Sequence, residues 1–242
     1  MKVFENEDQF HKKLNKNTKK INPSKEQVLS KAFQFHSQGN ISEAAKYYQY
    51  CINQGFENHI VLSNYGAILQ GLGKLQDAEL LYRKAIELNP DLAVAHSNLG
   101  NVLRGLGKLQ DAEISTRKAI KINPNYAIAH SNLGNILEEL GKLQDAEKSY
   151  RKAIELNPNY AAAYYSLSLI QYSDDNKLWQ DQIFSKNILM NKSKKDQVNI
   201  YFARANILHK RKKYKESSSY LELANNLKLN IYPSNSDHLI KQ

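Results

Sequence analysis

The sequence has very little cysteine and no long apolar run, and both absences narrow what the chain can be. Cys51 is the one cysteine among 242 residues, which excludes a disulfide framework and fits a reducing compartment. No stretch approaches the roughly 18 apolar residues that a membrane span needs. Residues 1–20 also lack the apolar core of a signal peptide. We therefore expect a cytoplasmic chain that has no membrane contact.

The sequence also has fewer acidic than basic residues, and its net charge is +10. Residues 59–160 are nearly neutral, with twelve Lys or Arg against eleven Asp or Glu. The excess lies in residues 1–24, with six against three, and in residues 161–242, with thirteen against seven. Two interpretations are open. Solvated lysine-rich ends are the one we favour, and weak binding of nucleic acid through those ends is the alternative.

One stretch of sequence is written repeatedly. The segment HSNLGNVLRGLGKLQDAE at residue 96 returns as HSNLGNILEELGKLQDAE at residue 130, and residues 93–126 agree with residues 127–160 at 26 of 34 positions. Residues 59–92 share the same frame, and residues 25–58 keep it more loosely. A fixed period of this length predicts an array of supersecondary units.

Each copy has the pattern of two helices. In residues 93–126 we expect a first helix from about 93 to 105 and a second from about 109 to 122, separated by the glycine-containing turn GLGK. Pro124 prevents the second helix from continuing. Gly100 is small where the two helices must approach closely, and the second helix is predicted to direct inward Ala112, Ile114 and Ala119.

These residues resemble the tetratricopeptide repeat signature, Trp-x-x-Leu-Gly-x-x-Tyr, then Ala-x-x-x-Phe, then Pro, over 34 residues. The copy at 93–126 departs from it at Thr116 and lacks the Trp. The three best copies match the signature at Leu62, Tyr65, Gly66, Leu69, Ala78, Tyr82 and Pro90; at His96, Leu99, Gly100, Leu103, Ala112 and Pro124; and at His130, Leu133, Gly134, Leu137, Ala146, Tyr150 and Pro158.

The resemblance implies an all-α fold, a right-handed α-solenoid of stacked helix-turn-helix units. Ser24 and Gln27 have the spacing of a capping box at the first helix. The expected organisation is a polar, disordered tail at 1–24, four units at 25–58, 59–92, 93–126 and 127–160, a degenerate fifth unit at 161–197, a closing unit at 198–229 and a tail at 230–242.

Helical geometry predicts which side of each first helix is left for binding. With 100° per residue, His96, Leu99, Gly100 and Leu103 share one side, and the opposite side carries polar residues. Stacking would align these polar sides, and an asparagine amide can both donate to and accept from a peptide backbone. In modules of the O-GlcNAc transferase type, which the array resembles, asparagines at this position hold protein substrates. The candidate peptide-binding residues are Asn64, Ser97, Asn98, Asn101, Arg104, Ser131, Asn132 and Asn135.

Three functions stay open. The first is a non-catalytic scaffold that binds extended protein or peptide segments. The second is a truncated or split substrate-targeting arm of a sulfotransferase or glycosyltransferase, acting with a separate transferase. It follows from the resemblance of residues 198–228 to arrays joined to sulfotransferase domains. The third is nucleic-acid binding, for which the run HKRKKYK at 209–215 is the strongest basic patch, although charged loops are usually only solvated.

No catalytic grouping, cofactor or metal site is expected. The GLGK turns lack the Ser or Thr that follows the lysine of a phosphate-binding loop. His96 and His130 occupy packing positions in their own repeats rather than converging as metal ligands. The exposed side of the first helices also carries Ser, Val or Ile where a clamp for a terminal carboxylate would need Lys or Arg, which disfavours that mode.

Overall fold

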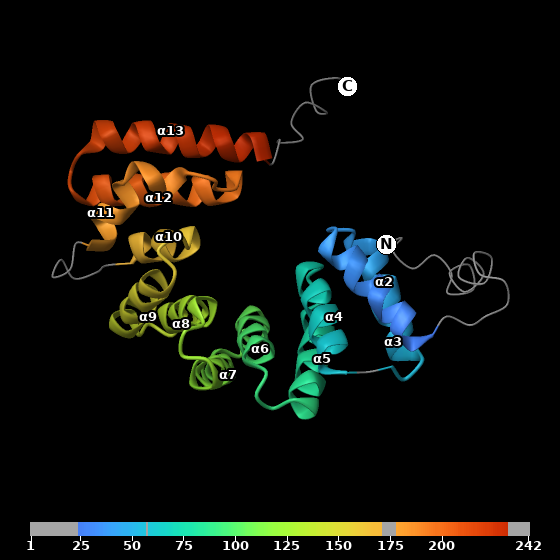
Figure 1. Ribbon diagram of the computed structural model, residues 1–242. Coiled ribbons are helices and arrows are strands. Elements are labelled where there is room, and N and C mark those ends of the chain that lie inside the picture. The colour runs from blue at the N-terminus through green and yellow to red at the C-terminus, as the bar shows by residue number, and fades with distance from the viewer. Residues whose placement is uncertain (1–23, 57, 171–177, 232–242) are drawn as a thin grey trace, which may run out of the picture. The chain divides into compact units, whose positions relative to one another are not determined.

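The computed structural model describes residues 24–56, 58–170 and 178–231 (Figure 1). In this part the regular elements are α-helices and one short 3-10 helix, η1. The chain divides into two compact units, residues 1–90 and 91–242, each of which has its own packing. The prediction of an all-α chain built from helix pairs is therefore confirmed. Most of the two predicted tails, at 1–24 and 230–242, lies outside the described residues, as does the polar break at 173–177; residues 230 and 231 belong to the last helix.

The first unit contains two antiparallel helix pairs, α2 with α3 and α4 with α5. Ser24 closes the first turn of α2 as predicted: its Oγ accepts from the Gln27 backbone nitrogen at 3.3 Å, and the Gln27 side chain accepts from the Ser24 nitrogen at 3.0 Å. The bounds are α2 Lys25–Ser37, α3 Ile41–Asn53, α4 His59–Gly71 and α5 Leu75–Leu88.

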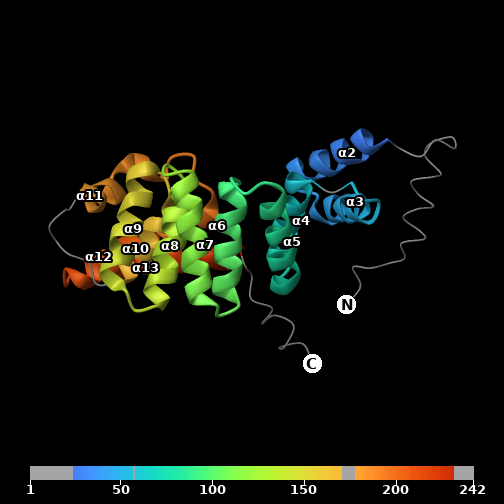
Figure 2. The same cartoon turned by 90° about the horizontal axis from the view of Figure 1, so that it is seen from below.

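The second unit continues the same pattern with less regularity toward its end. Figure 2 shows α6 to α9 side by side, and α6 contacts α8, α8 contacts α10, and α10 contacts α12. The first helices of successive pairs are thus neighbours within this unit. The bounds are α6 Ala93–Gly105, α7 Leu109–Ile122, α8 Ala127–Glu139, α9 Leu143–Leu156, α10 Ala161–Leu169, α11 Leu178–Phe184, η1 Lys186–Leu189, α12 Lys194–Lys210 and α13 Tyr214–Ile231.

The turn within each pair needs one residue in the left-handed backbone region. A residue with φ between +72° and +74° follows α2, α4, α6 and α8, and in each case it is glycine, which has no Cβ to clash. The equivalent residue between α12 and α13 is Lys212, with φ +59°. The four glycines are Gly39, Gly73, Gly107 and Gly141.

Close approach of paired helices explains the other repeated glycine, as the sequence predicted. A Cβ on Gly134 would lie 2.5 Å from Cε1 of the Tyr150 ring, and a Cβ on Gly66 would lie 3.1 Å from the Tyr82 ring. A Cβ on Gly100 would collide with the Thr116 side chain. Glycine at this position therefore lets the second helix approach the first closely.

One predicted core residue is wrong. Ala112 and Ala119 are fully buried, but Ile114 is 67% exposed. The corresponding residue in the next copy is Lys148, which also marks this position as solvent-facing. The inner side of α7 is formed by Ala112, Ser115, Thr116 and Ala119.

The end of the second unit is held by a buried arginine. Arg204 of α12 donates from Nε to the Ile183 carbonyl at 2.8 Å and from Nη2 to the Ser185 carbonyl at 3.1 Å. Its guanidinium also lies over the rings of Phe184, at 5.7 Å, and Tyr220, at 5.4 Å. The arginine therefore satisfies carbonyls at the end of α11 and joins three segments that sequence periodicity does not connect.

Candidate functional site

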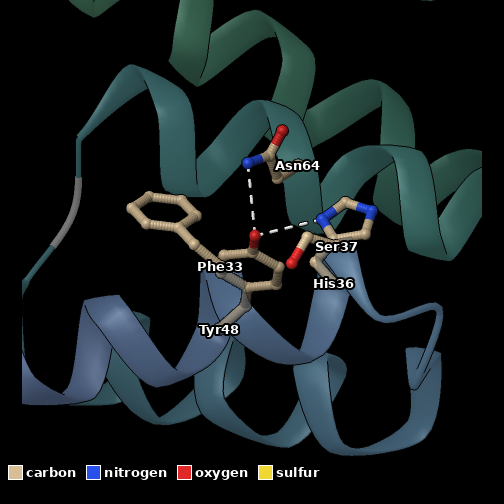
Figure 3. Close-up of a pocket in the computed structure, with 5 residues that line it drawn as sticks. All are labelled: Phe33, His36, Ser37, Tyr48 and Asn64. Carbon is tan, nitrogen blue, oxygen red and sulfur yellow. Dashed lines mark hydrogen bonds between the residues drawn. The ribbon is translucent and has the colours of Figure 1, made fainter.

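Asn64 of α4 lies beside a pocket in the first unit. The pocket has a volume of about 260 Å³ and is lined by Phe33, His36, Ser37, Tyr48 and Asn64. Figure 3 shows the Tyr48 hydroxyl between the other two polar groups: Asn64 Nδ2 donates to it at 3.2 Å, and His36 Nδ1 lies 3.1 Å from it. Burial raises the pKa of Tyr48, and the hydrogen bond from Asn64 opposes that shift. The phenol is therefore neutral near pH 7, and Asn64 is oriented by it.

The asparagine at the same repeat position in α8 is also oriented, by a different partner. Asn132 is half-buried and donates from Nδ2 to Ser97 Oγ of α6 at 3.1 Å. This bond links two successive first helices. Asn98 is half-buried as well, and its side chain makes no hydrogen bond within the described part of residues 91–242.

The interpretation of Ser97 and Ser131 as groove-lining residues is wrong. Ser97 is fully buried and Ser131 is 3% exposed. The helical-wheel argument placed them opposite the intra-repeat core, but a first helix in a stack also packs against the first helices beside it. Their hydroxyls instead serve neighbouring units: Ser97 accepts from Asn132, and Ser131 hydrogen-bonds with Tyr160.

Arg104 and Asn101 of α6 form a polar link to the next repeat. Arg104 donates from Nη2 to Asn101 Oδ1 at 3.1 Å and from Nη1 to Glu139 Oε1 of α8 at 2.6 Å. Its side chain is 31% exposed, and its Nε is buried without a partner in the described structure. The cation predicted to face a ligand is therefore already neutralised by a carboxylate.

Asn135 lies at the junction of α8, α9 and α10. Its Oδ1 is 2.9 Å from the Tyr150 hydroxyl and 3.3 Å from Ser166 Oγ, and the same tyrosine hydroxyl is 2.7 Å from Glu138 Oε2. Burial, followed by the hydrogen bond to Glu138, raises the pKa of Tyr150. Within 91–170 the predicted asparagines thus lie along neighbouring first helices, each half-buried.

The basic run 209–215 is partly committed to internal contacts. Lys210 Nζ donates to the carbonyls of Ser168, at 2.9 Å, and Ile170, at 2.6 Å, at the end of α10, and Arg211 donates to the side chain of Gln180. Lys213 pairs with Glu216 at 3.2 Å. These uses reduce the cations that could contact a phosphate backbone.

The metal-ligating side chains of the described residues stay apart from one another. No group of three His, Cys, Asp or Glu side chains comes together among the described residues. Cys51 is fully buried, and burial raises the pKa of its thiol to about 11. The thiol is therefore protonated and unreactive near pH 7. His130 Nε2 donates to the Pro124 carbonyl oxygen at 2.8 Å, so this ring is held within its own repeat.

No helix in the described ranges is both long and apolar enough to cross a membrane.

The geometry defines a class: an all-α repeat protein whose units are antiparallel helix pairs with glycine turns. Tetratricopeptide repeat models match residues 93–126, 127–160 and 198–231, and a further TPR repeat model matches residues 66–107. The chain belongs to the tetratricopeptide repeat family.

Two solved MamA structures agree on the fold. MamA is similar with a TM-score of 0.51 and 20% identity, over 82% of this chain and 95% of that one. MamA 41-end from Desulfovibrio magneticus RS-1 is similar with a TM-score of 0.53 and 16% identity, over 87% and 97%. The first TPR of Spaghetti (RPAP3), bound to HSP90 peptide SRMEEVD, gives a TM-score of 0.44 and 30% identity over 45% and 86%. No curated protein sequence matches the chain.

Proposed function

We propose that this protein is a non-catalytic interaction scaffold that binds extended peptide segments along its first helices. Membership of the tetratricopeptide repeat family supports a role in protein–protein interaction. The observation that carries the finer proposal is the state of Asn98 and Asn132, which occupy the same repeat position and are both half-buried at the surface of adjacent first helices.

Asn132 has the chemistry that holding a peptide backbone requires. One of its two amide hydrogens is taken by Ser97, which fixes the plane of the amide. The second hydrogen and the oxygen make no hydrogen bond in the described structure, so a peptide N–H and C=O could pair with them as a neighbouring strand would. Such pairing reads main chain rather than side chains and accepts varied sequences.

The expected affinity is modest. Each hydrogen bond contributes about 0.5–1.5 kcal/mol net, and ordering a flexible peptide opposes binding. We expect dissociation constants in the micromolar range that improve with the length of the bound segment.

The test is a titration of the protein with a labelled mixture of random peptides, comparing the wild type with the Asn98→Ala, Asn132→Ala double variant. We expect the double variant to lose binding while its circular dichroism stays helical. Unchanged binding in the double variant would remove the proposal.

Ser97→Ala provides the matched control, because it deletes the Ser97–Asn132 hydrogen bond but keeps both amides. Under the proposal, Ser97→Ala binds peptide more weakly than the wild type but more tightly than the double variant, because it frees the Asn132 amide plane and keeps both amides. If Ser97→Ala abolishes binding as fully as the double variant does, the asparagines act only by joining repeats, and the proposal fails.

A further inference from the structure

A second pocket, distinct from the asparagine positions, lies among α10, α12 and α13. Its volume is about 200 Å³. Its lining includes two aromatic residues, Tyr165 and Phe202, and two lysines, Lys195 and Lys228, with Asn199 and two aliphatic residues completing the wall. The pocket lies entirely within the second unit.

The two rings give the pocket a partly apolar wall. Their centroids are 6.0 Å apart with 47° between the planes, and both residues are half-buried. A cavity of about 150 Å³ lined by apolar side chains is large enough for a benzene ring. A third ring can add to such a pair edge-on or offset, an arrangement that aromatic groups favour.

The two lysines make the rim of the pocket positive. Lys195 and Lys228 are exposed, and neither forms an ion pair in the described structure. The residues that line the pocket include no acid. The nearest acid along α12, Asp196, accepts a hydrogen bond from the Ser193 hydroxyl at 2.7 Å at the start of the helix. A carboxylate supplied from outside would therefore find two uncompensated cations beside an apolar wall.

We propose that this pocket is a docking site for a partner peptide in which an aromatic side chain is flanked by Asp or Glu. The aromatic side chain packs against the ring pair of Tyr165 and Phe202, edge-on or offset, and the flanking carboxylates pair with Lys195 and Lys228. The proposal rests on the proposed function in assigning a peptide to this protein, but it uses none of the asparagines. It adds side-chain selectivity that main-chain recognition lacks.

Charge and shape favour a peptide over a nucleic acid here. Non-specific binding of single strands uses a row of cations that follows the backbone and successive stacking rings. This pocket offers two cations and two rings at one place. Lys210 and Arg211, in the basic run 209–215, are engaged with α10 and α11.

The test uses fluorescence anisotropy with the labelled peptide Gly-Ser-Glu-Phe-Asp-Ser-Gly and the full chain. Three changes to the peptide separate the contributions: Phe to Ala, both acids to their amides, and both changes together. The protein variants are Lys195→Gln with Lys228→Gln, and separately Phe202→Ala. Because the lysines are exposed, their replacement is not expected to affect folding. The matched control is Lys118→Gln with Lys121→Gln, which removes the same charge from the exposed side of α7.

We expect the Lys195/Lys228 variant to bind the acidic peptide about five- to tenfold more weakly, since it removes two exposed ion pairs that are each of modest strength. The control variant should bind as the wild type does, and the amide peptide should not distinguish the wild type from the Lys195/Lys228 variant. The Asn98→Ala, Asn132→Ala variant should keep the preference for the acidic over the amide peptide, so failure of the asparagine proposal and failure of this one are told apart.

Three results would overturn the proposal. One is equal binding of the acidic and amide peptides by the wild type. Another is binding of a single-stranded oligonucleotide through the two lysines without binding of the peptide. The third concerns residues 232–242, which follow Ile231 and include Asp237 and Leu239: at least tenfold tighter binding by a chain ending at 231 would mean that this segment, rather than a partner, occupies the pocket.

Discussion

Residues 93–126 and 127–160 differ at eight positions, and the two copies fill the space between their helices differently. In the second copy, Tyr150 of α9 is fully buried and its hydroxyl lies within hydrogen-bond distance of both Glu138 and Asn135. In the first copy, Thr116 takes the place of the tyrosine. It is also fully buried, but its hydroxyl has no partner in the described structure.

The lost tyrosine is compensated by a second difference. Arg104 stands where the later copy has Glu138, and it donates to Asn101, the counterpart of Asn135. A donor on the first helix thus replaces the tyrosine hydroxyl on the second. The asparagine therefore has a hydrogen-bond donor in both copies. The buried hydroxyl on the second helix has partners only in the second copy.

The largest expected effect comes from making the second copy like the first. Tyr150→Thr should destabilise the protein by about 3 kcal/mol, because truncating a large buried side chain leaves a cavity and removes the hydroxyl from Glu138. The midpoint of urea unfolding measures this. Tyr150→Phe is the control and should lose only about 1 kcal/mol.

The reverse exchange tests whether the residues at positions 104 and 116 are energetically coupled. Thr116→Tyr should stabilise more when combined with Arg104→Glu than alone, because only the pair restores the arrangement of the later copy. Additive single and double effects, within about 0.5 kcal/mol, would contradict the coupling between these positions.

A smaller contrast is expected at the repeated glycines. Gly134→Ala should cost about 1–3 kcal/mol, the usual range for overpacking, because the new Cβ meets carbons of the Tyr150 ring, the nearest at 2.5 Å. Gly100→Ala should cost less, because Thr116 can rotate its hydroxyl away. Thermal unfolding of both variants gives the order, and an equal loss would count against ring contact as the cause.

Alkaline pH should remove part of the stability that Tyr150 gives to the second copy, a loss that the first copy, with Thr116, does not share. The pKa of Tyr150 is raised in the folded protein, mainly by burial and then by the hydrogen bond to Glu138. As the pH rises, the tyrosine of the unfolded chain therefore loses its proton before the folded one does. The contribution of Tyr150 to the free energy of unfolding is complete below about pH 10 and decreases above it by up to about 1.4 kcal/mol per pH unit.

The measurement is the melting temperature from pH 8 to pH 11 for the wild type and Tyr150→Phe. The variant should lose less stability over this interval, although other buried tyrosines, such as Tyr164 with its pKa raised to about 12 by burial, keep part of the slope. Identical slopes would mean that Tyr150 does not contribute.

The smallest effect concerns the closing helix pair. Lys212 has φ +59° where the earlier pairs have glycine, so Lys212→Gly should stabilise by about 1 kcal/mol, since a residue with a Cβ is strained there. The converse change, Gly141→Lys, should destabilise by a similar amount. Denaturant midpoints of the two variants should shift in opposite directions.

The repeated part of the fold could be predicted from the sequence because its rules are local. Glycine at the turn, proline after the second helix and a small residue at Gly100 each follow from backbone geometry, and the structure confirms them. The signals weaken after Tyr160: α12 begins already at Lys194 rather than near 198. There the chain is held by Arg204 and Lys210, whose carbonyl partners lie on segments with no periodicity to reveal them.

The candidate site was only partly predictable for a related reason. A helical wheel locates the side away from the partner helix, and it correctly put Asn98 and Asn132 at the surface. A helical wheel does not include contacts with the first helices of the repeats on either side. Ser97 and Ser131 are therefore buried rather than exposed. The ring pair of Tyr165 and Phe202 also depends on contact between α10 and α12, which periodicity alone did not place.

The Arg104–Glu139 ion pair has a consequence for how nearly identical copies keep their order. Arrays of similar units are prone to pairing with the wrong copy during folding. Glu139 stands where the preceding copy has Gly105, and Arg104 where the following copy has Glu138. If the two copies exchanged places, glutamate would face glycine and no ion pair could form. The Arg104–Glu139 contact therefore favours the native order of the two copies over the exchanged one.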